Sequence, residues 1–165
     1  MRSDTALKVS DLIEQAKEKF ESGYHEIALD TLLEARRACQ RSDPQSDGTL
    51  YWEGLARICF AEGNFYAQQR ATYPQAIAAY EETIECCRLA VFVDHFNERP
   101  GMLEEALWRI FALNARLGQS REAVAAASRA LSGVGYPKVA GKPFARVRVM
   151  GTRRLMTIFS YLIRH

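Results

Sequence analysis

The sequence predicts an all-α protein built from antiparallel helical hairpins. Apolar residues recur at three- and four-residue spacing over long stretches of the 165-residue chain, and glycine or proline separates these stretches. Hydrophobic residues make up 48% of the chain and charged residues 25%, a balance typical of a folded globular protein. Because this length suits one hydrophobic core, we expect a single domain over residues 1–165.

The first predicted hairpin spans about residues 10–40. Its first helix carries an apolar stripe of Leu12, Ile13, Ala16 and Phe20, with Asp11 and Glu14 as an expected capping pair, and Gly23 ends it. The second helix carries a stripe of Ile27, Ala28, Leu32, Ala35 and Ala38. The polar segment 40–48, which contains Pro44, is expected to be a loop.

The second predicted hairpin spans about residues 49–93. Its first helix carries Trp52, Leu55, Ala56, Cys59 and Phe60 and is expected to end near Gly63. Its second helix is expected to begin at Thr72, where Thr72 caps the helix, Pro74 suits the first turn and Gln75 reaches back toward the cap.

The third predicted hairpin spans about residues 102–132, after a break at Pro100. Gly118 is expected to end its first helix in a left-handed conformation, and Ser120 to cap the second. In the basic segment 133–165, residues 146–149 alternate as in a short extended segment. A final amphipathic helix is predicted there from Leu155, Ile158, Phe159 and Leu162.

The three hairpins repeat one spacing of residues. Gly23 precedes Ala28, Leu32 and Ala35, and at identical offsets Gly118 precedes Ala123, Ala127 and Ala130. In the second hairpin Ala76, Tyr80 and Thr83 have the same spacing to one another, but they lie further from Gly63 than the corresponding residues lie from Gly23 and Gly118. The first helices place Ala16, Ala56 and Phe111 at the corresponding position.

This pattern resembles the tetratricopeptide repeat (TPR), in which small residues let paired helices cross closely. The resemblance implies a TPR-like right-handed superhelix with a C-terminal capping helix and a groove lined by the first helices. Successive second-helix alanines are 48 and 47 residues apart, against about 34 in a standard repeat, so the array is expected to be irregular. An ordinary helical bundle is the alternative.

Charge is unevenly distributed along the chain. Eight of the 22 Lys and Arg residues, and none of the 20 acidic residues, lie beyond Glu122, so residues up to 122 carry a net charge of −6. No secretory signal or long apolar run is visible, which predicts a cytoplasmic protein without a transmembrane segment.

No cofactor or metal site is predicted. The four cysteines, Cys39, Cys59, Cys86 and Cys87, lack a zinc-ligand spacing and are expected to be free, buried thiols. The segment 135–142 has glycines and a lysine but lacks the spacing, the Ser or Thr and the preceding strand of a phosphate-binding loop.

The sequence does not predict an enzyme. The three histidines, His25, His95 and His165, show no spacing that would join them to a nucleophile, and Asp94 beside His95 is expected to be a solvated surface pair. An enzyme with no recognisable motif is kept as an alternative.

Two sets of basic residues are expected to bind partners. The resemblance places Lys17, Arg57, Arg109 and Arg116 on or beside the groove, where they would favour an acidic protein or peptide. Arg146, Arg148, Arg153 and Arg154 are the residues we would assign to nucleic-acid binding, although the favoured partner of the basic segment is the acidic body of the protein or a second copy in a homodimer. Trp52 and Trp108 are expected to be core residues.

The function predicted from the sequence is a non-catalytic protein–protein interaction scaffold or adaptor that holds a peptide or helix. The alternatives are a transcription-associated module that contacts nucleic acid or its machinery through the basic segment, and a secretion-type chaperone. The basic C-terminus suits the chaperone poorly.

Overall fold

The structure, a computed structural model, describes residues 4–41, 48–94 and 100–132, and all its regular elements in these ranges are helical. Six α-helices follow one another along the chain, with a short 3₁₀ turn, η1 (Arg70–Thr72), between the third and fourth. They are α1 (Asp4–Glu21), α2 (His25–Gln40), α3 (Gly48–Tyr66), α4 (Tyr73–Asp94), α5 (Pro100–Leu117) and α6 (Ser120–Ser132). The predicted all-α fold class is therefore confirmed.

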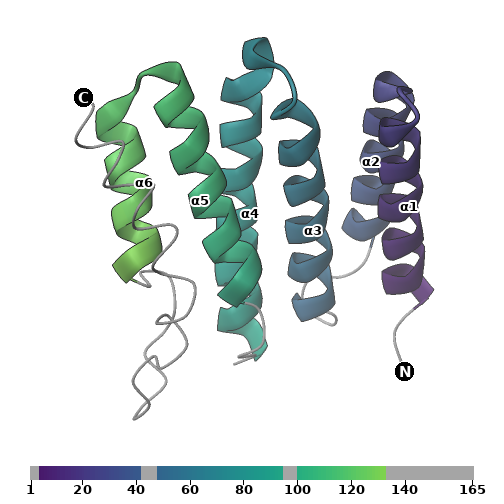
Figure 1. The fold of residues 1–165 in the computed structure, drawn as a ribbon. Coiled ribbons are helices and arrows are strands. Elements are labelled where there is room, and N and C mark those ends of the chain that lie inside the picture. Colours follow the sequence, from purple (N-terminus) through teal and green to yellow (C-terminus); the bar gives the residue numbers. More distant parts are fainter. Residues whose placement is uncertain (1–3, 42–47, 95–99, 133–165) are drawn as a thin grey trace.

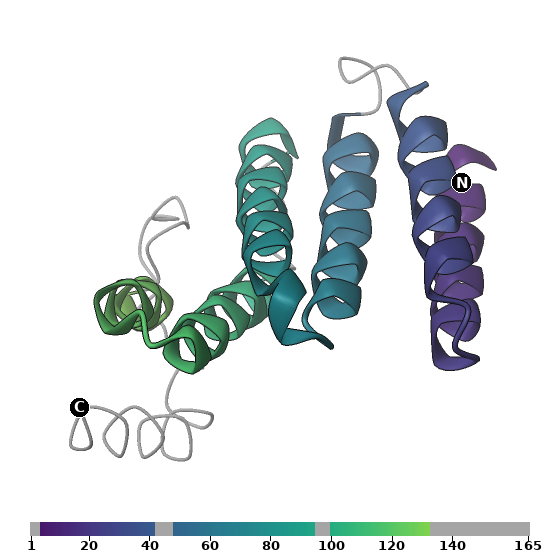
Figure 2. The same ribbon diagram turned by 90° about the horizontal axis from the view of Figure 1, so that it is seen from above.

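The helices form three successive antiparallel pairs, α1 with α2, α3 with α4 and α5 with α6 (Figure 1). The pairs stand in a row in chain order, and the third pair is turned relative to the first two. From above, α6 is seen nearly end-on, whereas α1 to α4 are seen from the side (Figure 2). The hairpins expected at 10–40, 49–93 and 102–132 correspond to these pairs.

The turns of the first and third hairpins have the same backbone geometry. Gly23 and Gly118 both have positive φ, 85° and 76°, as expected for left-handed residues that end a helix. After each glycine the next backbone N–H bonds five residues back, from Tyr24 to Lys19 (2.9 Å) and from Gln119 to Asn114 (2.9 Å). These bonds satisfy carbonyls that the ending helices leave open.

The second hairpin turns differently, because its first helix runs past the end that was expected near Gly63. α3 continues to Tyr66, and Gly63 is buried inside it. A Cβ at this position would lie 2.6 Å from Cε1 of Tyr80, so the glycine gives the ring of Tyr80 room between α3 and α4. The connection between the two helices is longer here than in the first and third hairpins, and it contains the 3₁₀ turn η1.

Thr72 directly precedes α4, at the predicted capping position, and is also the last residue of η1. Its hydroxyl donates to the carbonyl oxygens of Tyr66 (2.6 Å) and Gln69 (2.9 Å). These hydrogen bonds stabilise the connection between α3 and α4. α4 begins at Tyr73. The predicted capping role of Thr72 is thus replaced by a bond toward the preceding helix.

The starts of α1 and α6 differ from the prediction. α1 begins at Asp4, so Asp11 and Glu14 lie inside the helix, and Val9 extends its buried stripe toward the N-terminus. An aspartate in the first turn suits the positive end of the helix dipole. α6 begins at Ser120 itself, which leaves Gln119 at the position that precedes the helix.

One apolar core runs through all six helices, and the residues of the repeated spacing lie in it. Ala28, Ala76 and Ala123 have no exposed surface, and neither do Leu32 and Tyr80 at the next position of the pattern. On the first helices Ala16, Ala56 and Phe111 are buried as well. Small side chains at the crossings let the paired helices approach closely.

The predicted extended segment 146–149, the C-terminal helix and the basic segment 133–165 lie outside the described residues. Among the helices that the structure describes, none is both long and apolar enough to cross a bilayer.

Candidate functional site

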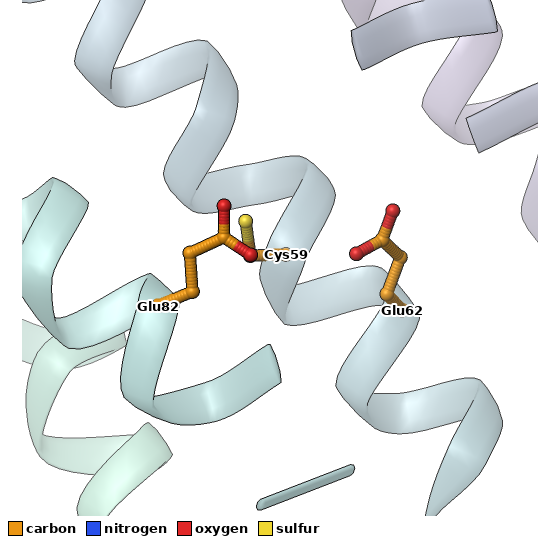
Figure 3. Close-up of side chains that lie close together, drawn as sticks. All are labelled: Cys59, Glu62 and Glu82. Carbon is orange, nitrogen blue, oxygen red and sulfur yellow. The ribbon is translucent and has the colours of Figure 1, made fainter. Parts of the chain in front are cut away.

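A group of ionisable side chains from three helices surrounds Arg36 of α2. Its guanidinium lies against both carboxylate oxygens of Glu82 on α4 (2.6 and 3.2 Å), a carboxylate oxygen of Glu62 on α3 (2.8 Å) and Sγ of Cys59 on α3 (3.2 Å). Figure 3 shows Cys59 and Glu62 on one helix and Glu82 reaching toward them from the next. We call these four residues the Arg36 cluster.

The three acceptors of this cluster satisfy the distance requirement for a metal site. One ligand atom from each of Cys59, Glu62 and Glu82 lies within 4.8 Å of the others. The positive charge between them, however, is supplied by Arg36, whose N–H groups point at all three. A metal ion here would have to displace a guanidinium that already satisfies them. The geometry is therefore explained by an ion pair within the protein.

Protonation in the cluster agrees with a structural ion pair. Hydrogen bonding to Arg36 holds the pKa of Glu82 below its ordinary value, and the two carboxylates raise the pKa of Arg36 despite its partial burial. The hydrogen bond between the Cys59 and Cys86 thiols raises the pKa of Cys59, together with burial, and lowers the pKa of Cys86. Cys59 is thus already engaged by Cys86 and by Arg36, and a ligand at this thiol would have to displace both contacts.

The cluster connects the first hairpin to the second. Arg36 comes from α2, whereas its acceptors come from α3 and α4, 23 to 46 residues further along the chain. The sequence shows Arg36 only as one polar residue of an amphipathic helix. Its partners could not be found from local spacing, because they depend on how two hairpins dock.

All four cysteines are free and buried, as predicted. Cys39 donates to the backbone carbonyl of Tyr51 at 3.2 Å, and burial raises its pKa to about 11. These thiols pack the contacts among α2, α3 and α4 as small, weakly polar residues.

The four groove residues named from the sequence lie on the first helix of each hairpin, and each is held by a different neighbour. Lys17 on α1 pairs with Glu14 (2.7 Å), and Arg109 on α5 pairs with Glu105 (3.0 Å). Arg57 on α3 donates to Oγ of Ser10 (2.8 Å), and Arg116 on α5 to the hydroxyl of Tyr73 (3.3 Å). Among the described residues, none of these hydrogen bonds or ion pairs joins two of the four.

The remaining predicted residues divide between surface, core edge and undescribed segments. His25 is exposed, with its ring centroid 4.5 Å from that of Phe20. Trp52 and Trp108 are half-buried against the core, and the indole of Trp108 donates to Glu104 (3.2 Å), so the expected core placement holds in part. The other named residues lie outside the described part of the chain: His95, His165, Arg146, Arg148, Arg153 and Arg154.

Comparison with known proteins finds no matching family model, no matching curated protein and no matching solved structure.

Proposed function

We propose that this chain is a non-catalytic interaction scaffold, a TPR-like array of three hairpins that forms an irregular right-handed superhelix and binds a protein partner on its first helices. The buried small residues at equivalent crossings of the hairpins and the matching turns at Gly23 and Gly118 support the TPR-like arrangement.

The binding surface in this proposal is a mainly polar stripe on each first helix, in which Phe60 and Ala112 are the two apolar members. On α1 it consists of Ser10, Glu14 and Lys17. Successive residues of the α3 and α5 stripes have the same four- and three-residue spacing, which keeps them on one side of a helix. All are exposed or half-buried, and together we call them the first-helix face: Ser10, Glu14, Lys17, Glu53, Arg57, Phe60, Asn64, Glu105, Arg109, Ala112 and Arg116.

One observation carries the proposal: the hydrogen bond from Arg57 to Ser10, which joins the stripe of α3 to that of α1 across two hairpins. Polar groups that recur at one spacing and meet between hairpins form a surface longer than any single helix offers. Such extended surfaces are what helical repeat proteins use to hold partners.

The non-catalytic part of the proposal is supported by the state of the reactive groups. The four thiols are buried, and the carboxylates of Glu62 and Glu82 form ion pairs with Arg36.

Charge reversal on the first-helix face tests the proposal. The full-length variant Lys17→Glu/Arg57→Glu should lose the proteins that the wild type captures from a cell extract, as identified by mass spectrometry. The matched control is Arg37→Glu, an exposed arginine on the second helix of the first hairpin, which should keep them. An unchanged set of proteins with the double variant, after circular dichroism has shown intact folding, would count against the first-helix face.

A further inference from the structure

The arginines that bridge neighbouring hairpins differ in what holds them. Arg36 meets two carboxylates and a thiol, which match its charge within the protein. Arg57 bridges α3 to α1, and Arg116 bridges α5 to α4, but each is held by a neutral hydroxyl. Among the described residues neither of these two arginines forms an ion pair with a carboxylate.

The contact of Arg57 fixes its guanidinium on a neutral hydroxyl, and its charge also acts on the nearby carboxylate of Glu14. Ser10 donates its own proton to the carbonyl of Ala6 (2.9 Å), so the lone pairs of its oxygen face the guanidinium, which donates at 2.8 Å. The nearby carboxylate of Glu14 is taken by Lys17 at 2.7 Å. A guanidinium has several N–H donors in one plane, so Arg57 keeps donors for a further acceptor.

Arg116 is held in a similar way at the junction of the second and third hairpins. Its Nη1 donates to the hydroxyl of Tyr73, a buried residue at the start of α4, while the side chain of Arg116 is exposed. A bond to a buried, packed side chain restricts the guanidinium in advance, which lowers the entropy lost when it binds a ligand.

We propose that Arg57 and Arg116 are the two cations through which the first-helix face binds carboxylate groups of an acidic, flexible peptide segment in a protein partner. This inference rests on the proposed function and narrows it. Lys17 and Arg109, each paired with a glutamate of its own helix, contribute little to this recognition.

The surrounding charges favour peptide carboxylates over nucleic-acid phosphates. Glu14, Glu53 and Glu105 lie on the same face, and the chain up to residue 122 carries a net charge of −6. A nucleic acid would bring closely spaced phosphates against these glutamates. A peptide with separated carboxylates can place them at the two arginines and keep uncharged residues beside the glutamates.

The test uses the purified full chain and an immobilised array of random-sequence peptides. The wild type should prefer peptides with a few separated Asp or Glu residues over peptides without acidic residues and over peptides with runs of them. Arg57→Gln and Arg116→Gln should each weaken binding to these peptides about tenfold, the effect of losing one charge-assisted hydrogen bond. Arg37→Gln and Arg121→Gln, exposed arginines on the second helices α2 and α6, are matched controls away from the first-helix face and should bind like the wild type. Circular dichroism and thermal unfolding show whether each variant is folded.

The outcomes separate this inference from the proposed function. Peptide binding without a preference for acidic residues, or equal losses in all four variants, would overturn the role of Arg57 and Arg116 while leaving the scaffold in place. The same role would be overturned if these two substitutions abolished binding of a single-stranded oligonucleotide and left peptide binding unchanged. If the wild type bound neither the array nor any extract protein, the scaffold itself would be contradicted.

Discussion

Single side chains decide how closely the helices of this chain approach one another, and the contact of Gly63 with Tyr80 illustrates this. Tyr80 is fully buried on α4, and its hydroxyl donates to the side-chain oxygen of Asn64 at 2.8 Å. The ring occupies space that a side chain at position 63 would need. A glycine that looks like a helix end in the sequence is therefore a packing residue inside a helix.

Replacing this glycine should destabilise the fold. Gly63→Ala would place a Cβ 2.6 Å from the Tyr80 ring. Overpacking of a well-packed core costs about 1–3 kcal/mol, against a gain of up to about 1 kcal/mol from the helix propensity of alanine. We expect a net loss of about 1–2 kcal/mol in the free energy of unfolding, measured with urea. Gly101→Ala, where a Cβ meets nothing within 4 Å, is the control, and equal stability of the two variants would refute this packing role.

Arg36 should contribute more to stability than an exposed arginine. Its side chain and that of Glu62 are each 19% exposed. Arg36→Ala leaves two carboxylates without their cation, and we expect a loss of about 2 kcal/mol, between the values for exposed and fully buried pairs. Arg88→Ala removes a more exposed pair with Glu85 within one helix and should cost less than about 0.5 kcal/mol. Urea unfolding of both variants measures the difference, and similar losses would contradict the assignment.

The Arg36 cluster should also make stability depend on pH. Because Arg36 lowers the pKa of Glu82 in the folded state, the stability from this pair is present above the pKa of an unfolded glutamate, about 4.3, and is lost as the pH falls through the lower folded value. Between pH 6 and pH 3 the free energy of unfolding of the wild type should fall more steeply than that of Arg36→Gln. Parallel pH profiles would show that the pair does not set this dependence.

At the scale of helices and turns, the sequence predicts elements better where local chemistry decides them. Gly23 and Gly118 end α1 and α5 as expected, because a left-handed residue there is a local requirement. α3 runs past Gly63, near which its end was expected. This glycine makes room for the Tyr80 ring of α4, a requirement that comes from another helix and not from a turn. The start of α1 was placed too late because Asp11 and Glu14, which suit a first turn, lie within a helix that Val9 extends.

The two turn glycines provide a prediction at this scale. Gly118→Ala puts an L side chain at φ 76° and should lower the free energy of unfolding by about 1–2 kcal/mol. Gly118→Asn should cost less, since asparagine tolerates this region. Thermal unfolding compares the two, and a Gly118→Ala variant as stable as the wild type would mean that the turn does not require the left-handed conformation.

The candidate site was less accessible to sequence analysis than the fold. The positions of Lys17, Arg57, Arg109 and Arg116 on first helices could be assigned from the repeat spacing, but their partners could not. Ser10 lies 47 residues before Arg57, and Tyr73 lies 43 before Arg116, so only the docking of hairpins brings them together. The Arg36 cluster could not be predicted for the same reason, because its acceptors lie 23 to 46 residues from Arg36 in the sequence.

For the whole molecule, the burial of all four cysteines predicts slow thiol chemistry in the folded state. With Ellman's reagent the native chain should react far more slowly than the unfolded chain, and in denaturant without reductant all four thiols should be titrated. The raised pKa of Cys39, about 11, acts in the same direction because the thiolate is the reactive form. Rapid labelling of the native chain, or fewer than four thiols after denaturation, would contradict this picture.

The turn of the third helix pair relative to the first two has a consequence for anything that spans the molecule. The α5–α6 pair points in a different direction from α1 to α4 (Figure 2). A straight, rigid rod laid along α1 and α3 would diverge from α5, whereas a chain without fixed shape can bend between the two directions and order itself only on contact. In the proposed scaffold, the orientation of this one hairpin would favour pliable ligands over preformed helices.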